Sequence, residues 1–161
     1  MEATTTALAV AQTLEQALVA GPEHFRPTLG RLYAEQVELR HEPALPPDGL
    51  VDGRRLAESS EREAAAIAGA MSDQRYDDIA VTVDGDLVTV RTALAGTLAD
   101  GRSVVLPTCM RCRVDTSGRV AAITHEMGPE AMRAWAEVAV AGGLVAAASL
   151  VDGPADRVGR S

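Results

Sequence analysis

The sequence predicts an α+β fold: a curved antiparallel sheet shaped like a cone, N-terminal helices packed over its concave face, and a C-terminal helix. The first observation is the stretch from Val88 to Met127, where three strand-like runs are separated by two turn signals, Ala99-Asp100-Gly101 and Asp115-Thr116-Ser117-Gly118. The runs have about 9 to 13 residues, whereas strands usually have about 5 or 6. Long antiparallel strands twist and curl, so we expect a concave face that other elements or a ligand must fill.

Helical patterns before this stretch are the second observation. Thr4 to Ala20 has apolar residues at three- and four-residue spacing, which predicts an amphipathic helix that ends before Gly21. Pro22 suits the first turn of a second helix, and the segment from Pro27 to Ala34 either continues that helix or forms a short separate one. Amphipathic helices need an apolar surface to cover, and the curved sheet supplies it.

The other elements lie on either side of these helices and strands. Val37 to His41 alternates as a strand does, and three prolines with Asp48-Gly49 then indicate a loop. A third helix begins at Asp52 or Gly53 and continues through Ala70. After a polar link, Tyr76 to Val83 is a further strand that precedes the long runs.

The C-terminal part of the chain predicts one helix and a tail. The pattern from Pro129 to about Leu150 is helical, with Gly142-Gly143 as a potential break. Asp152 to Ser161 is polar and rich in Gly and Arg, so we expect disorder there. No linker divides the chain, and we therefore expect one domain over residues 1–150 and a disordered tail over residues 151–161.

Composition and charge exclude several classes of partner. The net charge is −8, the pI is about 4.8, and there is no basic stripe, so neither nucleic acid nor an anionic membrane is expected as a partner. No apolar run is long enough to cross a bilayer. The N-terminus carries Glu2 and lacks the basic region of a secretory signal. A cytoplasmic location is the expectation that follows.

Four segments carry a resemblance to a known family. They are Leu39 to Pro47, Val88 to Arg91, Gly101 to Ser103, and Gly118 to Val120 leading to His125. With the order of elements, they make the chain resemble the nuclear-transport-factor-2-like superfamily, in the branch of SnoaL-like polyketide cyclases and limonene-epoxide hydrolase. The resemblance covers roughly residues 8–127, and it implies a cone with an interior pocket.

The resemblance also implies where catalytic residues would fall. The epoxide hydrolase uses two aspartates, an arginine between them, and a Tyr and an Asn that hold water. The arginine matches Arg91, whereas the aspartates fall on Ala93 and His125, and the Tyr and Asn fall on Leu39 and His41. Epoxide hydrolysis by that mechanism is therefore not expected, although a pocket with two histidines and an arginine remains.

Strand alternation indicates the same three residues, because His41, Arg91 and His125 each share a face with apolar neighbours. His125 is the first candidate for a general acid or base, since histidine has a pKa of about 6.5, and His41 is the second. Arg91 suits a developing oxyanion. The alternatives are a histidine bonded to a carbonyl at the rim, an exposed His41, and an arginine in a structural ion pair.

The same alternation predicts the residues that bind substrate. They are expected on the concave side: Leu39, Thr89, Leu106, Thr108, Met110, Ile123 and Met127. Tyr33 is added because it is expected to end a helix, from which its hydroxyl can reach the pocket. Glu42 and Glu126 should point away from them. Cys109 and Cys112 have the C-x-x-C spacing, but residues three apart in a strand face opposite sides, so redox or metal chemistry is not expected. No cofactor motif is present.

These features favour a cofactor-independent enzyme that acts by acid/base chemistry on a hydrophobic polyketide- or terpenoid-like small molecule. Cyclisation, isomerisation, dehydration and hydrolysis all stay open. The alternative is a non-catalytic binding or dimerisation module with the same fold, which the missing carboxylates favour. The Ala/Val-rich C-terminal helix and an exposed sheet face predict a homodimer.

Overall fold

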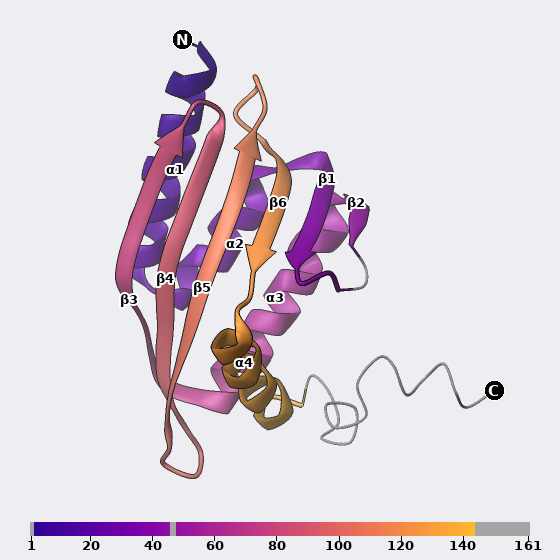
Figure 1. The fold of residues 1–161 in the computed structure, drawn as a ribbon. Helices are drawn as coiled ribbons and strands as arrows, with labels where there is room; N and C mark the ends of the chain where they lie inside the picture. The colour runs from indigo at the N-terminus through magenta and orange to yellow at the C-terminus, as the bar shows by residue number, and fades with distance from the viewer. Residues whose placement is uncertain (1, 46–47, 144–161) are drawn as a thin grey trace, which may run out of the picture.

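A computed structural model gives the structure and describes residues 2–45 and 48–143 of the 161-residue chain. Helices and strands follow one another in an order close to the predicted one (Figure 1). Their bounds are α1 Glu2–Ala20, α2 Pro22–Leu32, β1 Tyr33–Glu42, β2 Gly49–Asp52, α3 Gly53–Ala70, β3 Met71–Asp84, β4 Leu87–Leu98, β5 Ser103–Val114, β6 Val120–Glu126 and α4 Pro129–Ala141.

The strands form one curved, unclosed sheet in the order β2-β1-β6-β5-β4-β3 (Figure 1). The predicted α+β class is confirmed, but the expectation of a wholly antiparallel sheet is wrong, because β1 and β6 run parallel. Parallel neighbours need a long crossover connection, and here the connection contains α3 and three other long strands. Local periodicity does not specify which distant strand a segment will pair with.

Helices α1, α2 and α3 lie on one face of the sheet (Figure 1), as the amphipathic patterns predicted. Helix α1 packs on β3, β4 and β5, while α3 packs on α2 and β1. Helix α4 packs against β5 and α3. Within the described ranges, no helix is both long enough and apolar enough to cross a membrane.

Local chemistry explains where the helices begin and end. Pro22 and Pro129 occupy the first turns of α2 and α4, where their missing N–H groups cost nothing. The Asp52 carboxylate accepts a hydrogen bond from the Arg55 N–H at 3.0 Å and so caps α3. Helix α4 ends at the predicted Gly142-Gly143 break. The expected continuation to Leu150 and the predicted tail lie outside the described residues.

Several predicted boundaries are wrong. Helix α2 continues through Pro27, which was one of the two alternatives predicted, but it ends at Leu32, so Tyr33 begins β1 rather than ending a helix. Strand β2 was expected to be loop. Strand β3 begins at Met71 and includes the predicted polar link, because register shifts interrupt its alternation. Asp73 and Asp78 lie beside these shifts with φ of 54° and 55°, a conformation that Asp tolerates in bulges.

Two apolar clusters fill the space between the sheet and the helices. The larger joins α1 and α2 to the inner sheet face, with Leu14, Leu18, Val88 and Ile123 almost fully buried. The smaller joins α3 and α4 to the other ends of β4 and β5 through aliphatic side chains such as those of Leu94 and Leu106. Because the chain has few aromatic residues, this core is almost entirely aliphatic.

Candidate functional site

The inner face of the sheet brings two histidines together. His41 on β1 is directly opposite His125 on β6, and both follow buried inward residues, Leu39 and Ile123, by two positions. Their rings stack with centroids 5.3 Å apart and an interplanar angle of 22°. The prediction that these two histidines share one face is therefore confirmed, and the parallel pairing of β1 and β6 is what makes them neighbours.

Asp48 holds His41 in place. Its Oδ1 lies 2.5 Å from Nδ1 of His41, and its Oδ2 accepts hydrogen bonds from the N–H groups of His41 and Leu45 at 3.0 and 3.1 Å. The hydrogen bond from the His41 side chain is the main cause that lowers the pKa of Asp48. This carboxylate therefore stays ionised and orients the imidazole, as in a His–carboxylate pair.

His125 is in a different environment from His41. Burial lowers its pKa to about 3, with further contributions from the charges of Arg26 and His41, while Asp48 acts in the opposite direction. Its ring forms no side-chain hydrogen bond with any described residue. At neutral pH His125 is therefore an uncharged imidazole, with one nitrogen that can donate a hydrogen bond and one that can accept a hydrogen bond.

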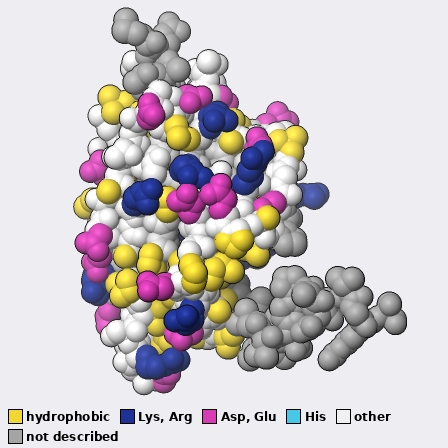
Figure 2. All heavy atoms as spheres, in the orientation of Figure 1, with side chains coloured by type: hydrophobic (Ala, Val, Ile, Leu, Met, Phe, Trp, Pro, Cys, Tyr) yellow, Lys and Arg dark blue, Asp and Glu magenta, His cyan; other side chains and the backbone are white. Residues whose placement is uncertain are grey.

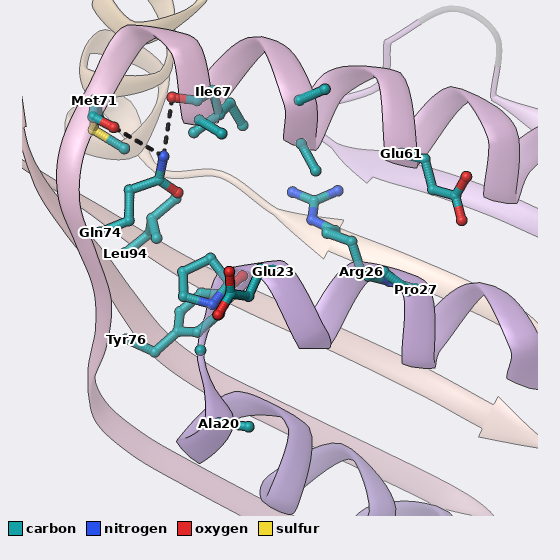
Figure 3. Close-up of a pocket in the computed structure, with 15 residues that line it drawn as sticks. Ala20, Glu23, Arg26, Pro27, Glu61, Ile67, Met71, Gln74, Tyr76 and Leu94 are labelled. Carbon is teal, nitrogen blue, oxygen red and sulfur yellow. Dashed lines mark hydrogen bonds between the residues drawn. The ribbon is translucent and has the colours of Figure 1, made fainter.

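A cavity of about 560 Å³ opens between α2, α3 and the adjoining strands (Figure 3). Its walls are mostly apolar: alanines of α3 together with Pro22, Met71 and Leu94. Glu23 and Glu61 lie at exposed positions of its rim, whereas Arg26, Gln74 and Tyr76 supply polar groups from partly buried positions. An apolar space with a few polar groups is typical of a small-molecule site.

Arg26 is the cation of this cavity. Its side chain is 24% exposed, and its guanidinium lies 3.4 Å from a carboxylate oxygen of Glu63 on α3. Burial acts to lower its pKa, but Glu63, Tyr76 and Tyr33 outweigh burial, so the pKa of Arg26 lies above its usual value. The same charge helps to lower the pKa of His125, which connects the cavity electrostatically to the histidine pair.

Arg91 lies on the other face of the sheet, so the prediction that it converges with the two histidines is wrong. Val90 and Thr92 are the buried, inward residues of this part of β4, whereas Arg91 is exposed. Thr89 and Ala93 share its outer orientation by alternation. The positions carried over from the epoxide hydrolase to Arg91 and Ala93 therefore do not face the interior.

The outer face is bound together by ion pairs instead. Arg111 donates to Glu126 at 2.7 Å and to both oxygens of Glu42 at 3.0 Å, which ties β5 to β6 and β1. Figure 2 shows charged side chains gathered over the middle of this face, and none of the described histidines is visible on it. The prediction that Glu42 and Glu126 point away from the interior is confirmed.

None of the predicted catalytic or substrate-binding residues, all of which are described, lines the cavity. Tyr33, Leu39, Met110 and Ile123 are part of the larger apolar cluster. Leu106 belongs to the smaller cluster, and Met127 packs against it. The Thr108 hydroxyl donates to the Thr92 carbonyl at 3.3 Å. Alternation identified the inward side chains of β1, β5 and β6 correctly, but it failed for Thr89 and Arg91 of β4 and could not distinguish packed core from cavity wall.

The site also contains residues that the sequence reading missed. Arg26 lies four residues after Pro22 and three before Leu29, so helical spacing could have placed it on the inward face of α2. Asp48 was assigned to a loop, and nothing local indicated that the loop returns to His41. Gln74 was assigned to a link. An arginine was expected inside the fold, and the arginine found there is Arg26 rather than Arg91.

Comparison with known families now adds to this geometry. The SnoaL-like domain matches residues 14–123, which is most of the chain and includes His41 but ends two residues before His125. The chain belongs to the SnoaL-like domain family. No curated protein matches the sequence. The suspected branch of the superfamily is thus confirmed, and a SnoaL-like fold makes an enzymatic role plausible without specifying a reaction.

Solved structures support the same fold. The chain is similar to the BvnE pinacolase of Penicillium brevicompactum, with 12% identity, a TM-score of 0.60, and coverage of 86% of this chain and 94% of that one. An LEH-like epoxide hydrolase of M. tuberculosis shares 18% identity at a TM-score of 0.53, over 88% and 97% of the two chains. An NTF2-like protein of unknown function from Burkholderia pseudomallei shares 16% identity at a TM-score of 0.53, over 74% and 88%. Identities this low show the fold alone.

Proposed function

We propose that the protein is a cofactor-independent enzyme that performs acid/base chemistry on a hydrophobic, polyketide- or terpenoid-like small molecule. The observation that carries the proposal is the Asp48–His41 pair, with His41 stacked on His125 at the inner sheet face. Structural neighbours that include a pinacolase and an epoxide hydrolase support an enzymatic role at the level of the fold. Membership in the SnoaL-like family supports it further.

In this proposal His41 moves the proton, which was the role first expected for His125. Asp48 occupies Nδ1 of His41, so Nε2 is the nitrogen that accepts a proton, and the carboxylate stabilises the imidazolium that forms. A general base works best with a pKa near the working pH, and burial takes His125 far below that range. His125 instead provides a neutral partner that does not repel the imidazolium.

The simplest step consistent with these groups is enolisation of a ketone. Nε2 of His41 takes a proton from the carbon beside the carbonyl, and the C–H electron pair moves onto the carbonyl oxygen as an enolate. In a β,γ-unsaturated ketone the enolate is conjugated, and return of the proton from His41 to the γ-carbon shifts the double bond and completes an isomerisation. Attack by the carbanion on a second carbonyl of the substrate forms a carbon–carbon bond, and the His41 imidazolium returns its proton to the resulting alkoxide, which completes a cyclisation.

A non-catalytic binding module is the second candidate. The observation that favours it is that neither His41 nor His125 lines the 560 Å³ cavity. In that case the cavity binds a ligand, and the histidine pair contributes to structure.

The test uses beta-tetralone, an enolisable bicyclic ketone, and follows exchange of its acidic C–H protons with heavy water by NMR. We expect the protein to accelerate this exchange, and we expect His41→Gln and Asp48→Asn each to reduce the acceleration by about a hundredfold. Both substitutions preserve side-chain size. His24→Gln is the matched control, because His24 is exposed on α2 and does not belong to the histidine pair.

Two results would contradict the enzyme assignment. One is full exchange activity in folded His41→Gln and Asp48→Asn proteins. The other is saturable binding of the ketone by the wild-type protein without any acceleration, which is the outcome that the binding module predicts.

A further inference from the structure

Gln74 presents a hydrogen-bond acceptor to the cavity. Its Nε2 donates to the carbonyls of Ile67 and Met71, each at 3.1 Å (Figure 3). These two bonds fix the orientation of the amide and leave Oε1 with no donor among the described residues. A ligand hydroxyl or N–H group would satisfy this oxygen.

Tyr76 presents a hydrogen-bond donor to the same cavity. Tyr76 lines the cavity, and the charge of the nearby Arg26 opposes the rise in the pKa of Tyr76 that burial causes. A tyrosine hydroxyl has one hydrogen to donate, and no group of the described residues accepts it, so this hydrogen is available to a ligand. The edge-to-face contact of Tyr76 with Phe25, with centroids 5.6 Å apart, holds the ring.

The charge inside the cavity is already balanced. Arg26 and Glu63 are 3.4 Å apart, with side chains 24% and 34% exposed. The other carboxylates nearby, Glu23 and Glu61, are exposed at the rim. A ligand carboxylate would enter beside Glu63 and lose its hydration without gaining an unpaired cation, which is unfavourable. A neutral ligand oxygen carries no charge, so it avoids this loss of hydration energy.

From these observations we infer that the cavity binds a neutral oxygenated molecule, with a carbonyl oxygen on the Tyr76 hydroxyl and a ligand hydroxyl on Oε1 of Gln74. The positive charge of Arg26 makes the Tyr76 hydroxyl a stronger hydrogen-bond donor. The apolar walls and the volume of about 560 Å³ suit a ring system of the size of a small drug. The inference specifies the kind of ligand for the proposed function. It rests on that function, which requires a site for a small-molecule substrate.

The experiment measures binding with two probes of the same ring system, a hydroxylated acetonaphthone and the corresponding hydroxynaphthoate. Since the chain has two tyrosines, the variant Tyr33→Phe leaves Tyr76 as the sole tyrosine, and isotope-labelled tyrosine then gives one NMR signal. We expect the ketone to shift this signal and to bind about tenfold more tightly than the carboxylate. Tyr33 is buried outside the cavity, so Tyr33→Phe should change affinity for the ketone less than about twofold.

Two further variants test the roles of individual groups. Tyr76→Phe keeps the ring and its packing but removes the donor, so the ketone should bind roughly tenfold more weakly. Glu63→Gln leaves Arg26 unpaired, and it should reverse the preference between the probes in favour of the carboxylate. A melting curve for each variant verifies that it is folded.

The inference is overturned if the wild-type protein prefers the carboxylate, if neither probe shifts the Tyr76 signal, or if Tyr76→Phe and Tyr33→Phe have equal effects. The readout is binding of a probe and does not involve His41. Binding as expected without tetralone exchange would therefore leave the ligand assignment intact and remove the enzyme function. Tetralone exchange without probe binding at Tyr76 would leave the enzyme function intact and remove the ligand assignment.

Discussion

The two faces of the sheet carry ionisable side chains in opposite environments. On the inner face, burial and the charges of Arg26 and His41 lower the pKa of His125 to about 3. On the outer face, Arg111 stays in contact with solvent and pairs with Glu42 and Glu126. The pKa of Glu126 is lowered chiefly by a hydrogen bond from Cys109 and then by Arg111.

This difference indicates where chemistry can arise in the fold. Desolvation changes the protonation state of a group, because the charged form loses its hydration. Solvent-exposed ion pairs keep their ordinary charges and contribute little free energy. Ionisable residues on the inner face, such as His41, are therefore candidates for function, whereas those on the outer face mainly fix strand positions.

The largest expected effect compares two adjacent residues of β6. Ile123 is 1% exposed on the inner face, and Thr124 follows it on the outer face. Ile123→Ala should lower the free energy of unfolding by about 3 kcal/mol, since it removes buried methyl groups and leaves a cavity. Thr124→Ala should cost less than about 1 kcal/mol. Urea unfolding of both variants measures the difference, and equal losses would mean that β6 is not oriented as described.

This alternation is the part of the structure that the sequence predicted best. Leu39, Ile123 and His125 were predicted to face the interior because strand side chains alternate between faces, and the structure places them there. The same rule failed for Arg91, since the resemblance to the epoxide hydrolase suggested a face that the buried Val90 and Thr92 contradict. A polar residue next to apolar ones on both sides in the chain belongs to the opposite face from them.

The site was harder to predict, because its parts come from distant segments. Asp48 contacts His41 from the segment before β2. Arg26 on α2 lies near Tyr76 on β3, more than forty residues further along the chain. No local sequence pattern predicts such contacts between distant segments. The stacking of His41 on His125 depends in addition on the parallel pairing of β1 with β6, which periodicity along a strand does not contain.

An intermediate effect concerns acid stability. The pKa of His125 is about 3 in the folded state and about 6.5 when unfolded. Between these values the unfolded state binds more protons, so the free energy of unfolding falls as the pH falls below about 6.5, by at most about 1.4 kcal/mol per pH unit. His125→Gln should remove this slope, and at about pH 5 it should reduce the acid penalty by roughly 2 kcal/mol.

Urea titrations between about pH 5 and 7 measure this slope. That window lies above the range in which Asp48 titrates, because its pKa is lowered in the folded state. His24→Gln is the control, as His24 is exposed on α2 and should leave the slope unchanged. A slope in His125→Gln equal to that of the wild-type protein would show that His125 is not desolvated.

The smallest effect compares two arginines of the outer face. Arg111 contacts Glu42 and Glu126, whereas Arg91 is exposed and forms no ion pair within the described part of the chain. Arg111→Met should lower the free energy of unfolding by about 1 kcal/mol at low salt, because two carboxylates lose their shared cation, and Arg91→Met should change it by less than about 0.3 kcal/mol. The loss in Arg111→Met should shrink at about 1 M salt, where the Debye length is about 3 Å. If both variants lost the same free energy at both salt concentrations, the outer ion pairs would not contribute to joining β5 to β1 and β6, and packing alone would have to hold this part of the sheet together.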